Sequence, residues 1–348
     1  MTHRSFFSFM LPSLLAMFLF IVLPTGSIIV QSFYTEHGKA LSLAENCGPF
    51  GCEQTTHIDL AITEELREEA PLGKFNGLGT YLDRAHLAVD EISKIFEESE
   101  SAGEVVSRIY NLPFYKALSF TIAYTFFATP LAMMVGFLVA MAVNNIPKKI
   151  KGPVIFLSLL PYIVTPLIGS LTLFWMINSN GIIGATLQFI FNDPDLSLKA
   201  SPVLTWVTLI VYGIWHMAPF PFVVYYAGLQ TIPQDTMESA MIDGASKWER
   251  IRYVVIPHLF PLTTFLALVL MMDNFRIFEP IVGFSAEANA TSLSWSIYND
   301  LNGQVDKLYG SAASTSVLTV ICVVILLIPV LLRTWRSFKQ KNPDGSAS

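Results

Sequence analysis

Long stretches without a single charged side chain divide this sequence, and they constrain its fold more than any other feature. The hydrocarbon layer of a bilayer is about 30 Å thick and needs roughly 20 apolar residues for each helical crossing. Six stretches meet that length, and five of them contain no Asp, Glu, Lys or Arg. They cover residues 5–33, 117–143, 153–177, 202–229, 259–283 and 312–332.

The composition agrees with a membrane protein. Charged residues make up 14% of the chain, whereas soluble domains have roughly 25%. A helix satisfies its own backbone hydrogen bonds in lipid, and the alternating segments of about ten residues typical of a β-barrel do not occur. We therefore expect an all-α membrane protein with six transmembrane helices.

The first stretch has two interpretations. Arg4 precedes an apolar run, as in a signal peptide, but the run continues to Val30 without a clear small-residue cleavage site. That length exceeds the core of most signal peptides. A retained helix over residues 1–33 is the favoured prediction, and cleavage is the alternative.

The distribution of basic residues predicts the orientation. Lys and Arg collect on the cytoplasmic side of membrane proteins, and with six crossings three basic segments fall on one side. The segment 34–114, which is rich in Asp and Glu, falls on the other side, so both termini are expected in the cytoplasm. The net charge of −6 comes mostly from this acidic segment and says little about nucleic acid. No nucleic-acid partner is expected. The basic residues are Lys148, Lys149, Lys151, Lys247, Arg250, Arg252, Arg333, Arg336, Lys339 and Lys341.

Two of the three cysteines lie in the acidic segment. Cys47 and Cys52 enclose Gly-Pro-Phe-Gly, and Gly and Pro allow a tight turn. An oxidising compartment would permit a disulfide between them. A metal site has less support, because only His57 lies close by.

The acidic segment is too long to be a simple connection. Residues 59–70 and 83–101 have helical patterns, and Leu87, Ile92 and Ile95 mark an apolar stripe in the second, with Phe96. We expect a small helical insertion outside the cytoplasm, with a solvated linker as the alternative.

The loop 231–257 between the fourth and fifth stretches has its own helix signals. Asp235 can cap a helix, with Glu238 at capping-box spacing. Gly244 then bends the chain, and Ser246 can cap a second helix with Glu249 three residues later. The pattern predicts two short helices at an angle.

This loop resembles the EAA loop of binding-protein-dependent ABC importer permeases. The family pattern is Glu-Ala-Ala, three residues, Gly, nine residues, Ile, one residue, Leu-Pro, and the spacing from Glu238 to Pro257 matches throughout. The departures are Ser239 for Ala, Val254 for Ile and Ile256 for Leu. Residues 242–248, 228–233 and 274–279 resemble the sugar-permease branch, and the maltose-transporter type is the most similar. The resemblance covers residues 114–336.

The resemblance implies a permease fold and a mechanical role. In that family the loop docks into a separate ATPase subunit and transmits its motion. The alternative is an ordinary pair of surface helices anchored by Trp248. The coupling residues implied here are Glu238, Ser239, Ala240, Asp243, Gly244 and Ala245.

The implied assembly contains this chain, a second similar but non-identical permease, two ATPase subunits and an extracytoplasmic solute-binding protein. ATP and Mg²⁺ would be held by the ATPases, and this chain would bind no cofactor. The implied location is the bacterial inner membrane. Residues 115–336 would form the core permease domain and residues 337–348 a polar cytoplasmic tail.

Ionisable residues interrupt the fifth stretch. Asp273, Arg276 and Glu279 are costly at membrane depth unless they are paired or hydrated, and such residues default to a functional interpretation. Spacings of three place them near one helix face, where Arg276 can pair with either acid. Lining of a substrate pathway and structural pairing are both open, whereas Asn274 is expected to line the pathway.

The fourth stretch presents Gly213, His216, Met217 and Phe220 at positions i, i+3, i+4 and i+7, which share one helix face. The resemblance implies that sugar contacts come from this stretch and from the region of Asn274. Ordinary packing is the alternative for each of these residues.

No catalytic motif is present: the sequence has no phosphate-binding loop, no Gly-x-Ser-x-Gly and no His-Glu-x-x-His. One rival function is an ion-coupled secondary transporter with Asp273 and Glu279 as proton carriers, which would leave the 231–257 loop without a purpose. A membrane enzyme acting on lipids lacks a nucleophile or metal set. The sequence does not determine which sugar, polyol or sugar phosphate is carried.

Overall fold

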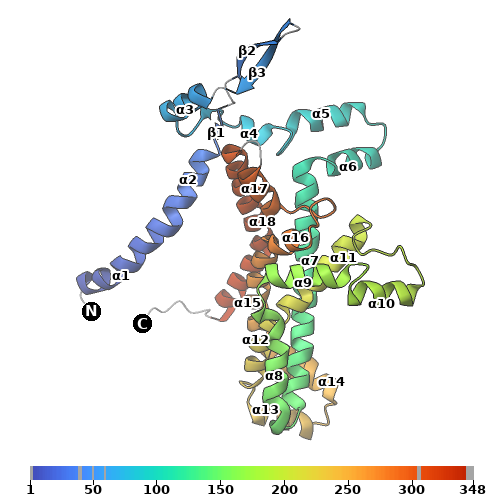
Figure 1. The fold of residues 1–348 in the computed structure, drawn as a ribbon. Helices are drawn as coiled ribbons and strands as arrows, with labels where there is room; N and C mark the ends of the chain where they lie inside the picture. The colour runs from blue at the N-terminus through green and yellow to red at the C-terminus, as the bar shows by residue number, and fades with distance from the viewer. Residues whose placement is uncertain (1–2, 38–40, 49–50, 59, 304–306, 342–348) are drawn as a thin grey trace. The chain divides into compact units, whose positions relative to one another are not determined.

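A computed structural model describes residues 3–37, 41–48, 51–58, 60–303 and 307–341. The chain forms two compact units, Met1–Tyr115 with Ser296–Val320, and Lys116–Trp295 with Ile321–Ser348 (Figure 1). Three helices continue from one unit into the other: α7 (Pro113–Asn145), α17 (Leu293–Asn302) and α18 (Tyr309–Lys341).

The first unit starts with a long apolar helical segment. It consists of α1 (His3–Met17), a π-helical turn η1 (Phe18–Val22) and α2 (Leu23–Gln31). None of the residues in its most apolar window is buried. The span Phe9–Gln31 contains no charged residue, and a helix with apolar side chains exposed all round is typical of a segment that faces lipid or another membrane helix.

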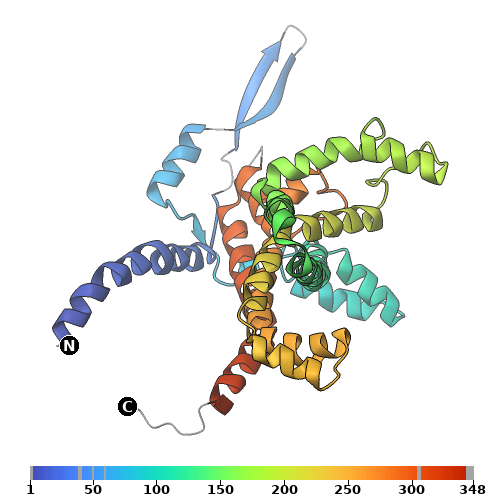
Figure 2. The same ribbon diagram turned by 90° about the horizontal axis from the view of Figure 1, so that it is seen from below.

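The segment after α2 contains strands that the sequence interpretation did not include. Strand β1 (Tyr34–Thr35) pairs with β4 (Lys74–Phe75), and β2 (Leu41–Gly48) pairs with β3 (Gly51–Ile58) as an antiparallel hairpin (Figure 2). Strand β2 ends at Gly48 and β3 begins at Gly51, and residues 49–50 lie outside the described part of the chain. The Gly-Pro-Phe-Gly run was a turn signal, but the polar flanking residues did not suggest strands.

The same segment also contains helices. They are α3 (Leu60–Glu69), α4 (Gly79–Leu82), α5 (Val89–Glu98) and α6 (Ala102–Tyr110). Helices α5 and α6 form a hairpin (Figure 1) around a small core of Ala88, Ile95 and Leu112. Ser101 caps α6 by accepting a hydrogen bond from the backbone N–H of Glu104 at 3.3 Å.

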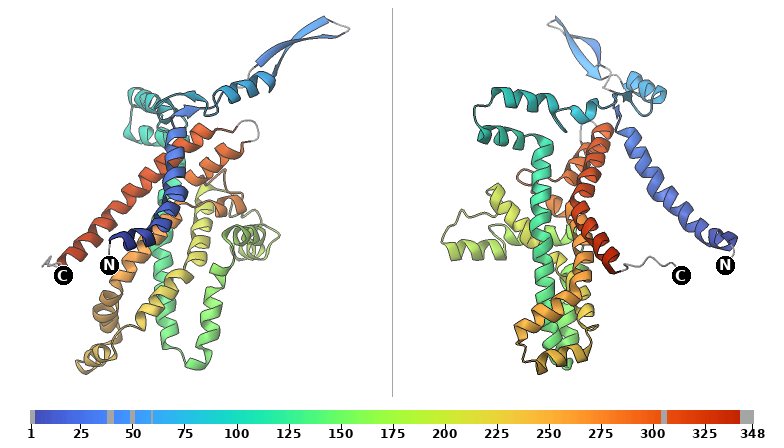
Figure 3. Two further views of the ribbon diagram at one scale, coloured as in Figure 1. Left: turned by 90° about the vertical axis from the view of Figure 1, so that its left-hand side faces the viewer. Right: turned by 180° about the vertical axis from the view of Figure 1, so that it is seen from behind.

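The second unit is a bundle of helices (Figure 3). One buried cluster includes Phe120, Leu209 and Tyr212, and another includes Phe222 and Leu259. Besides α7, its helices are α8 (Lys148–Ile163), α9 (Pro166–Ile177), α10 (Ile182–Phe191), α11 (Pro202–Met217), α12 (Pro219–Leu229), α13 (Gln234–Ile242), α14 (Lys247–Arg250), the π-helical turn η2 (Ile251–Val255), α15 (Ile256–Phe275) and α16 (Glu279–Gly283).

Among the described residues, five helical segments are long and apolar enough to cross a membrane. They are Phe9–Gln31, Pro113–Asn145, Pro202–Leu229, Lys247–Phe275 and Tyr309–Leu332. Helices α8 and α9, which meet at a bend of 92°, make a sixth if the pair counts as one span. The predicted six helices agree with this count.

Two predicted stretches are not continuous helices. Residues 153–177 break between α8 and α9, where Val164 and Thr165 have extended backbone angles. The residue before a proline disfavours the helical conformation, and Pro166 follows Thr165. Residues 259–283 break after Phe275, and a new helix, α16, begins at Glu279 with Pro280 in its first turn, where proline is tolerated.

Two loops predicted to share one side of the membrane lie at the same end of the second unit. Gln230, at the end of α12, donates a hydrogen bond from Nε2 to Oδ1 of Asn144 near the end of α7 at 2.9 Å. The start of α8, which carries Lys148 and Lys149, therefore lies near the start of the 231–257 loop. That this end faces the cytoplasm stays a prediction.

Candidate functional site

The 231–257 loop forms the two short helices that the sequence predicts, α13 and α14. The start of α13 differs from the prediction. Pro233 occupies the N-cap position and Asp235 makes no capping hydrogen bond. Proline has a restricted backbone that suits the start of a helix, so α13 begins at Gln234. Nε2 of Gln234 donates to Oε1 of Glu238 at 2.6 Å.

Gly244 ends α13 in a defined way. Its φ is +80°, a conformation that glycine adopts without steric cost. The N–H of Gly244 donates to the carbonyl of Met241 at 3.1 Å, and the N–H of Ala245 donates to the carbonyl of Ala240 at 3.0 Å. This pair of bonds is the Schellman motif. Gly244 thus fixes the bend that separates α13 from α14.

Ser246 starts the second helix, as the sequence predicts. Its hydroxyl accepts a hydrogen bond from the N–H of Glu249 at 3.3 Å, and its own N–H donates to Oε2 of Glu249 at 2.7 Å. This reciprocal capping box leads through α14 and η2 into α15. The loop is therefore attached to a membrane-spanning helix without an intervening flexible segment.

The loop exposes apolar side chains as well as charges. Ile242 is 86% exposed and Trp248 is 69% exposed, so Trp248 does not anchor the helix pair to the bundle. Glu238 and Asp243 are also exposed. An exposed mixture of apolar and acidic side chains on a rigid bend is typical of a surface that binds another protein.

A cavity of about 440 Å³ lies elsewhere in the second unit. It collects side chains from α7, α9, α11, α15, α16 and α17. Seven of the eight predicted pathway residues line it. Its lining residues are Tyr124, Pro166, Tyr212, Gly213, His216, Met217, Asp273, Asn274, Arg276, Ile277, Phe278, Glu279, Pro280 and Ser294.

Phe220 is the predicted pathway residue that does not line the cavity. Its ring stacks on Tyr162, with ring centroids 6.2 Å apart, and it packs with the second buried cluster. The helix changes at Ala218, where α11 ends and α12 begins with Pro219. The periodicity of one ideal helix therefore does not extend from Gly213 to Phe220.

The charged residues surround the end of α15 instead of sharing one helix face. Nη2 of Arg276 lies 3.2 Å from Oδ1 of Asp273, so Arg276 pairs with this acid. Glu279 starts the separate helix α16. The prediction of a common face for all three residues is wrong, because α15 stops at Phe275. All three still line the cavity.

Asn274 has a buried position in the cavity wall. It is 2% exposed, and its Nδ2 donates to Oγ1 of Thr129 at 2.9 Å. Its Oδ1 has no hydrogen-bond partner among the described residues. A buried acceptor without a partner is costly.

The side chains of His216 and Tyr212 form hydrogen bonds with backbone carbonyls at the break between α8 and α9. Nε2 of His216 lies 3.0 Å from the carbonyl oxygen of Val164, and the hydroxyl of Tyr212 donates to the carbonyl of Pro166 at 2.8 Å. Backbone carbonyls released by a helix break at membrane depth need such donors. His216 thus combines a structural role with its place in the cavity wall.

Sequence reasoning missed seven of the lining residues, which are Tyr124, Pro166, Tyr212, Ile277, Phe278, Pro280 and Ser294. Buried tyrosine hydroxyls usually find a hydrogen-bond partner. The tyrosines inside the uncharged stretches could therefore have been predicted to lie near other polar groups. A Cβ on residue 213 would collide with the Tyr124 hydroxyl. Gly213 therefore serves the close packing of α7 against α11.

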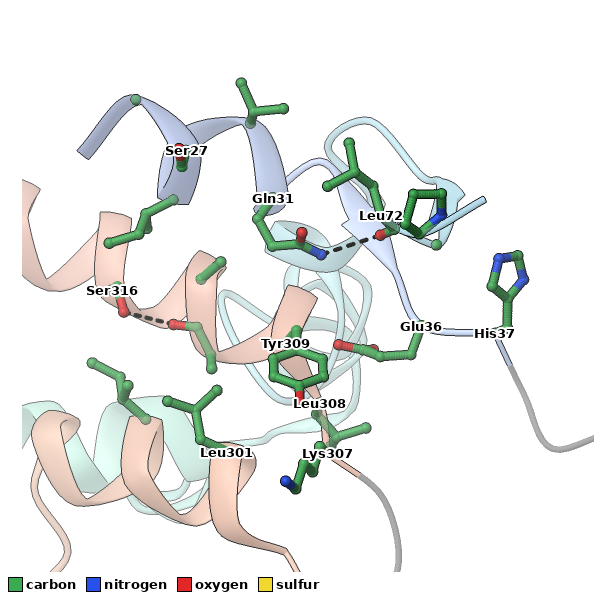
Figure 4. Close-up of a pocket in the computed structure, with 18 of the residues that line it drawn as sticks. Ser27, Gln31, Glu36, His37, Leu72, Leu301, Lys307, Leu308, Tyr309 and Ser316 are labelled. Atoms are coloured by element: carbon green, nitrogen blue, oxygen red, sulfur yellow. Dashed lines mark hydrogen bonds between the residues drawn. The ribbon is translucent and has the colours of Figure 1, made fainter. Parts of the chain in front are cut away.

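A larger cavity of about 1490 Å³ lies within the first unit (Figure 4). It is lined by parts of α2, α17 and α18 and by the segment around Leu72, whose carbonyl accepts a hydrogen bond from Nε2 of Gln31 at 3.2 Å. No predicted pathway residue lines it. The predicted pathway residues thus collect in the second unit.

The cysteine prediction is tested only at the level of the backbone. Cys47 and Cys52 are opposite each other in the β2–β3 register, but their side chains lie outside the described part of the chain, so the disulfide stays a prediction. Cys322 has a free thiol. In the described residues, no group of three or more His, Cys, Asp or Glu is arranged to hold a metal ion.

Comparison with known proteins identifies similar chains. A family model described as "Binding-protein-dependent transport system inner membrane component" matches residues 105–336. The trehalose/maltose transport system permease protein of Thermococcus litoralis is 28% identical over 63% of this chain and 74% of that protein. The sn-glycerol-3-phosphate transport system permease protein of Agrobacterium fabrum is 28% identical over 61% of this chain and 73% of that protein.

A solved structure shows the same fold. It is a bacterial ABC transporter involved in the import of the acidic polysaccharide alginate, with a TM-score of 0.59 and 18% identity. The match covers 79% of this chain and 99% of that chain.

Proposed function

The chain belongs to the family of inner membrane components of binding-protein-dependent transport systems, and from this premise we propose that it forms half of a translocation pathway. The transporter would be an ATP-binding-cassette importer for a carbohydrate, a polyol or a sugar derivative. The names of the relatives, which refer to trehalose, maltose and sn-glycerol-3-phosphate, support this class of solute.

The observation that carries the proposal is the rigid bend of the 231–257 loop. The Schellman motif at Gly244 and the capping box at Ser246 define its shape, and α14 continues through η2 into α15. A partner that pushes on this loop would move α15, and with it Asp273 and Asn274 in the cavity wall. Such a rigid connection suits a transporter that is driven by a separate ATPase subunit.

The cavity presents polar and aromatic groups together with the charged side chains of Asp273, Arg276 and Glu279. Asn274 offers a buried acceptor, and the aromatic rings of Tyr124 and Tyr212 line the same space. Sugars present hydroxyl groups to polar side chains and apolar ring faces to aromatic ones. The second half of the pathway would come from a similar permease, and the solute from an extracytoplasmic binding protein.

The proposed cycle is alternating access. ATP-driven closure of two ATPase subunits moves the coupling loops, the pathway opens outward, and the binding protein releases its solute into the cavity. Hydrolysis of ATP on the partner subunits then returns the pathway to the inward state. In this cycle the loop and both termini face the cytoplasm. An ion-coupled transporter is not favoured, because it gives the loop no task.

The test changes one exposed carboxylate. Glu238→Ala should abolish uptake and prevent co-purification of the ATPase from mild detergent, while the protein stays folded in the membrane. Asp235→Ala is the matched control, because Asp235 lies in the same helix and makes no cap bond. Normal uptake by the Glu238 variant would contradict the coupling role.

A further inference from the structure

An uncharged stretch in the second unit is longer than one membrane crossing requires. No charged side chain occurs between Lys151 and Asp193. Helices α8 and α9, which make up the sixth candidate span, account for this stretch only as far as Ile177. The rest includes α10, a helix of 10 residues, which is about 15 Å long and therefore too short to cross the hydrocarbon layer. Helix α10 thus has the composition of a membrane segment without being a span.

The helix that precedes α10 starts at membrane depth. The hydroxyl of Tyr212 donates to the carbonyl of Pro166, the first residue of α9, and Pro166 lines the same cavity as Tyr124. Tyr124 follows Ala117, where the uncharged stretch of α7 begins, by seven residues, or about 10 Å along a helix. Helix α9 leaves α8 at a bend of 92°, and α9 and α10 run across the direction of α7 (Figure 1, and Figure 3 from two other sides). Helix α9 therefore begins inside the hydrocarbon layer and does not leave it by the shortest route.

A tight corner fixes α10 to the end of α9. The N–H of Gly181 donates to the carbonyl of Asn178 at 2.7 Å. A Cβ on Gly184 would collide with the same carbonyl oxygen, so the first turn of α10 lies directly against the chain that leaves α9. Ile183 packs against the buried cluster that includes Phe120. The depth of α10 therefore follows from that of α9.

The side of α10 opposite Gly184 is apolar and exposed. Ile182, Phe189 and Ile190 are 77%, 87% and 65% exposed. Together with Thr186 they have the spacing i, i+4, i+7 and i+8 of one helix face. Oγ1 of Thr186 donates to the carbonyl of Ile182 at 2.6 Å, so the helix itself satisfies the hydroxyl. This stripe of four side chains therefore offers a partner apolar surface without a charge.

The residues that follow α10 are polar and fold back onto it. Asn192, with a φ of +50°, ends the helix. The N–H of Asp193 donates to the carbonyl of Gln188 at 3.1 Å, and Nε2 of Gln188 donates to the carbonyl of Leu196 at 3.2 Å. Asp193 and Asp195 are exposed. An apolar stripe beside a polar loop is the arrangement of helices that lie in the interface of a bilayer.

We propose that α10 lies in the leaflet opposite the 231–257 loop, with Ile182, Phe189 and Ile190 among phospholipid acyl chains and residues 192–200 at the headgroups. Three of the four side chains in the stripe are large, whereas membrane helices pack closely through small residues. No residue of α10 lines either cavity described above. Lipid therefore suits this stripe better than a helix of a second permease. The inference requires a membrane protein, and it depends on neither the solute nor the ATPase.

The experiment measures what surrounds the stripe in the full chain, together with any subunits that co-purify with it. A nitroxide spin label is attached to Phe189→Cys, with Cys47, Cys52 and Cys322 replaced by alanine. The protein is placed in nanodiscs of phosphatidylethanolamine and phosphatidylglycerol. Collisions of the label with oxygen, which concentrates among acyl chains, are compared with collisions with a water-soluble nickel chelate. At position 189 we expect the collisions with oxygen to dominate.

Asp195→Cys is the matched control, because this exposed residue lies in the polar loop a few positions later. There the collisions with nickel should dominate, so that the order of the two reagents reverses between the two positions. A second measurement needs no substitution. A phospholipid with a photoreactive diazirine in its acyl chain is irradiated with the wild-type protein, and mass spectrometry should find the label in the peptide that contains residues 182–191.

Three results would overturn the inference. Few collisions with either reagent at position 189 would show that protein covers the stripe. Dominance of nickel at position 189 would show that α10 faces water. If the Phe189 variant does not fold, the wild-type protein decides: label in α7 without label in residues 182–191 would place α10 away from the acyl chains. None of these results concerns uptake or the ATPase, so a failure here is distinct from a failure of the proposed function.

Discussion

The coupling loop and the cavity are built by different kinds of contact. In the loop, the bonds at Gly244, Ala245 and Ser246 join residues no more than five positions apart. In the cavity wall, the hydrogen bond from Tyr212 spans 46 positions and that from Asn274 to Thr129 spans 145. The first region is encoded locally, and the second depends on helix packing.

Two glycines illustrate the difference. A Cβ on Gly244 would have no heavy atom within 4 Å, but its φ of +80° excludes most side chains. A Cβ on Gly136 would lie 2.7 Å from the backbone N of Phe222 and 2.8 Å from the carbonyl oxygen of Ala218. Gly244 is required by its own backbone, whereas Gly136 is required by the approach of α12 to α7.

The largest effect is expected from Gly136→Ala. The added methyl group meets backbone atoms, which cannot rotate away, so we expect a loss of stability of about 1–3 kcal/mol. The apparent Tm in detergent measures it. Gly152→Ala is the control, because a Cβ there has no neighbour within 4 Å, and alanine should be neutral or slightly stabilising in this helix. An equal Tm for both variants would contradict the packing argument.

Gly244→Ala should cost about 1–2 kcal/mol of local strain, because alanine disfavours a positive φ. The strain lies in an exposed turn, so uptake should fall while the Tm of the bundle changes little. Asparagine tolerates this conformation better, so Gly244→Asn should retain more uptake. If alanine and asparagine reduce uptake equally, the backbone conformation is not the cause.

Ser246→Ala removes the hydroxyl of the capping box and should cost about 1 kcal/mol. Hydrogen exchange of the amide of Glu249 reports this, since that amide donates to the Ser246 hydroxyl. Ser239→Ala is the control, because Ser239 is exposed in the middle of α13. Unchanged exchange at Glu249 would show that the capping box contributes nothing.

The smallest effect is expected from Asp273→Asn. The ion pair with Arg276 is partly exposed, and such pairs contribute less than about 1 kcal/mol. The Tm should therefore change little, while uptake changes if the residue lines the pathway. A large fall in Tm with unchanged uptake would identify the pair as a structural lock.

The sequence predicted most of the conformation of the 231–257 loop, with one error. Ser246 and Glu249 form the predicted capping box, and Gly244 makes the predicted bend. Asp235 does not cap α13, because Pro233 already supplies a suitable backbone one residue before the helix. Neighbouring residues can each serve as the N-cap of a helix, so a two-residue capping pattern does not determine at which of them the helix begins.

The sequence predicted only part of the cavity lining. Asp273, Asn274, Arg276 and Glu279 all line it, yet they do so because α15 ends at Phe275 and the chain turns. The predicted common helix face does not exist. Phe220 was misplaced for a similar reason, since Pro219 starts a new helix. Proline positions were visible, but the direction that the chain takes after each break depends on its neighbours.

The sequence by itself determined that the chain is a helical membrane protein with a bent, capped loop. Hydropathy, basic residues and turn chemistry act over a few residues and need no partner. The tertiary structure decided which carbonyls His216 and Tyr212 satisfy, where Asn274 finds Thr129, and how His86 reaches α18. These contacts join residues more than 40 positions apart, and only packing of the helices brings them together.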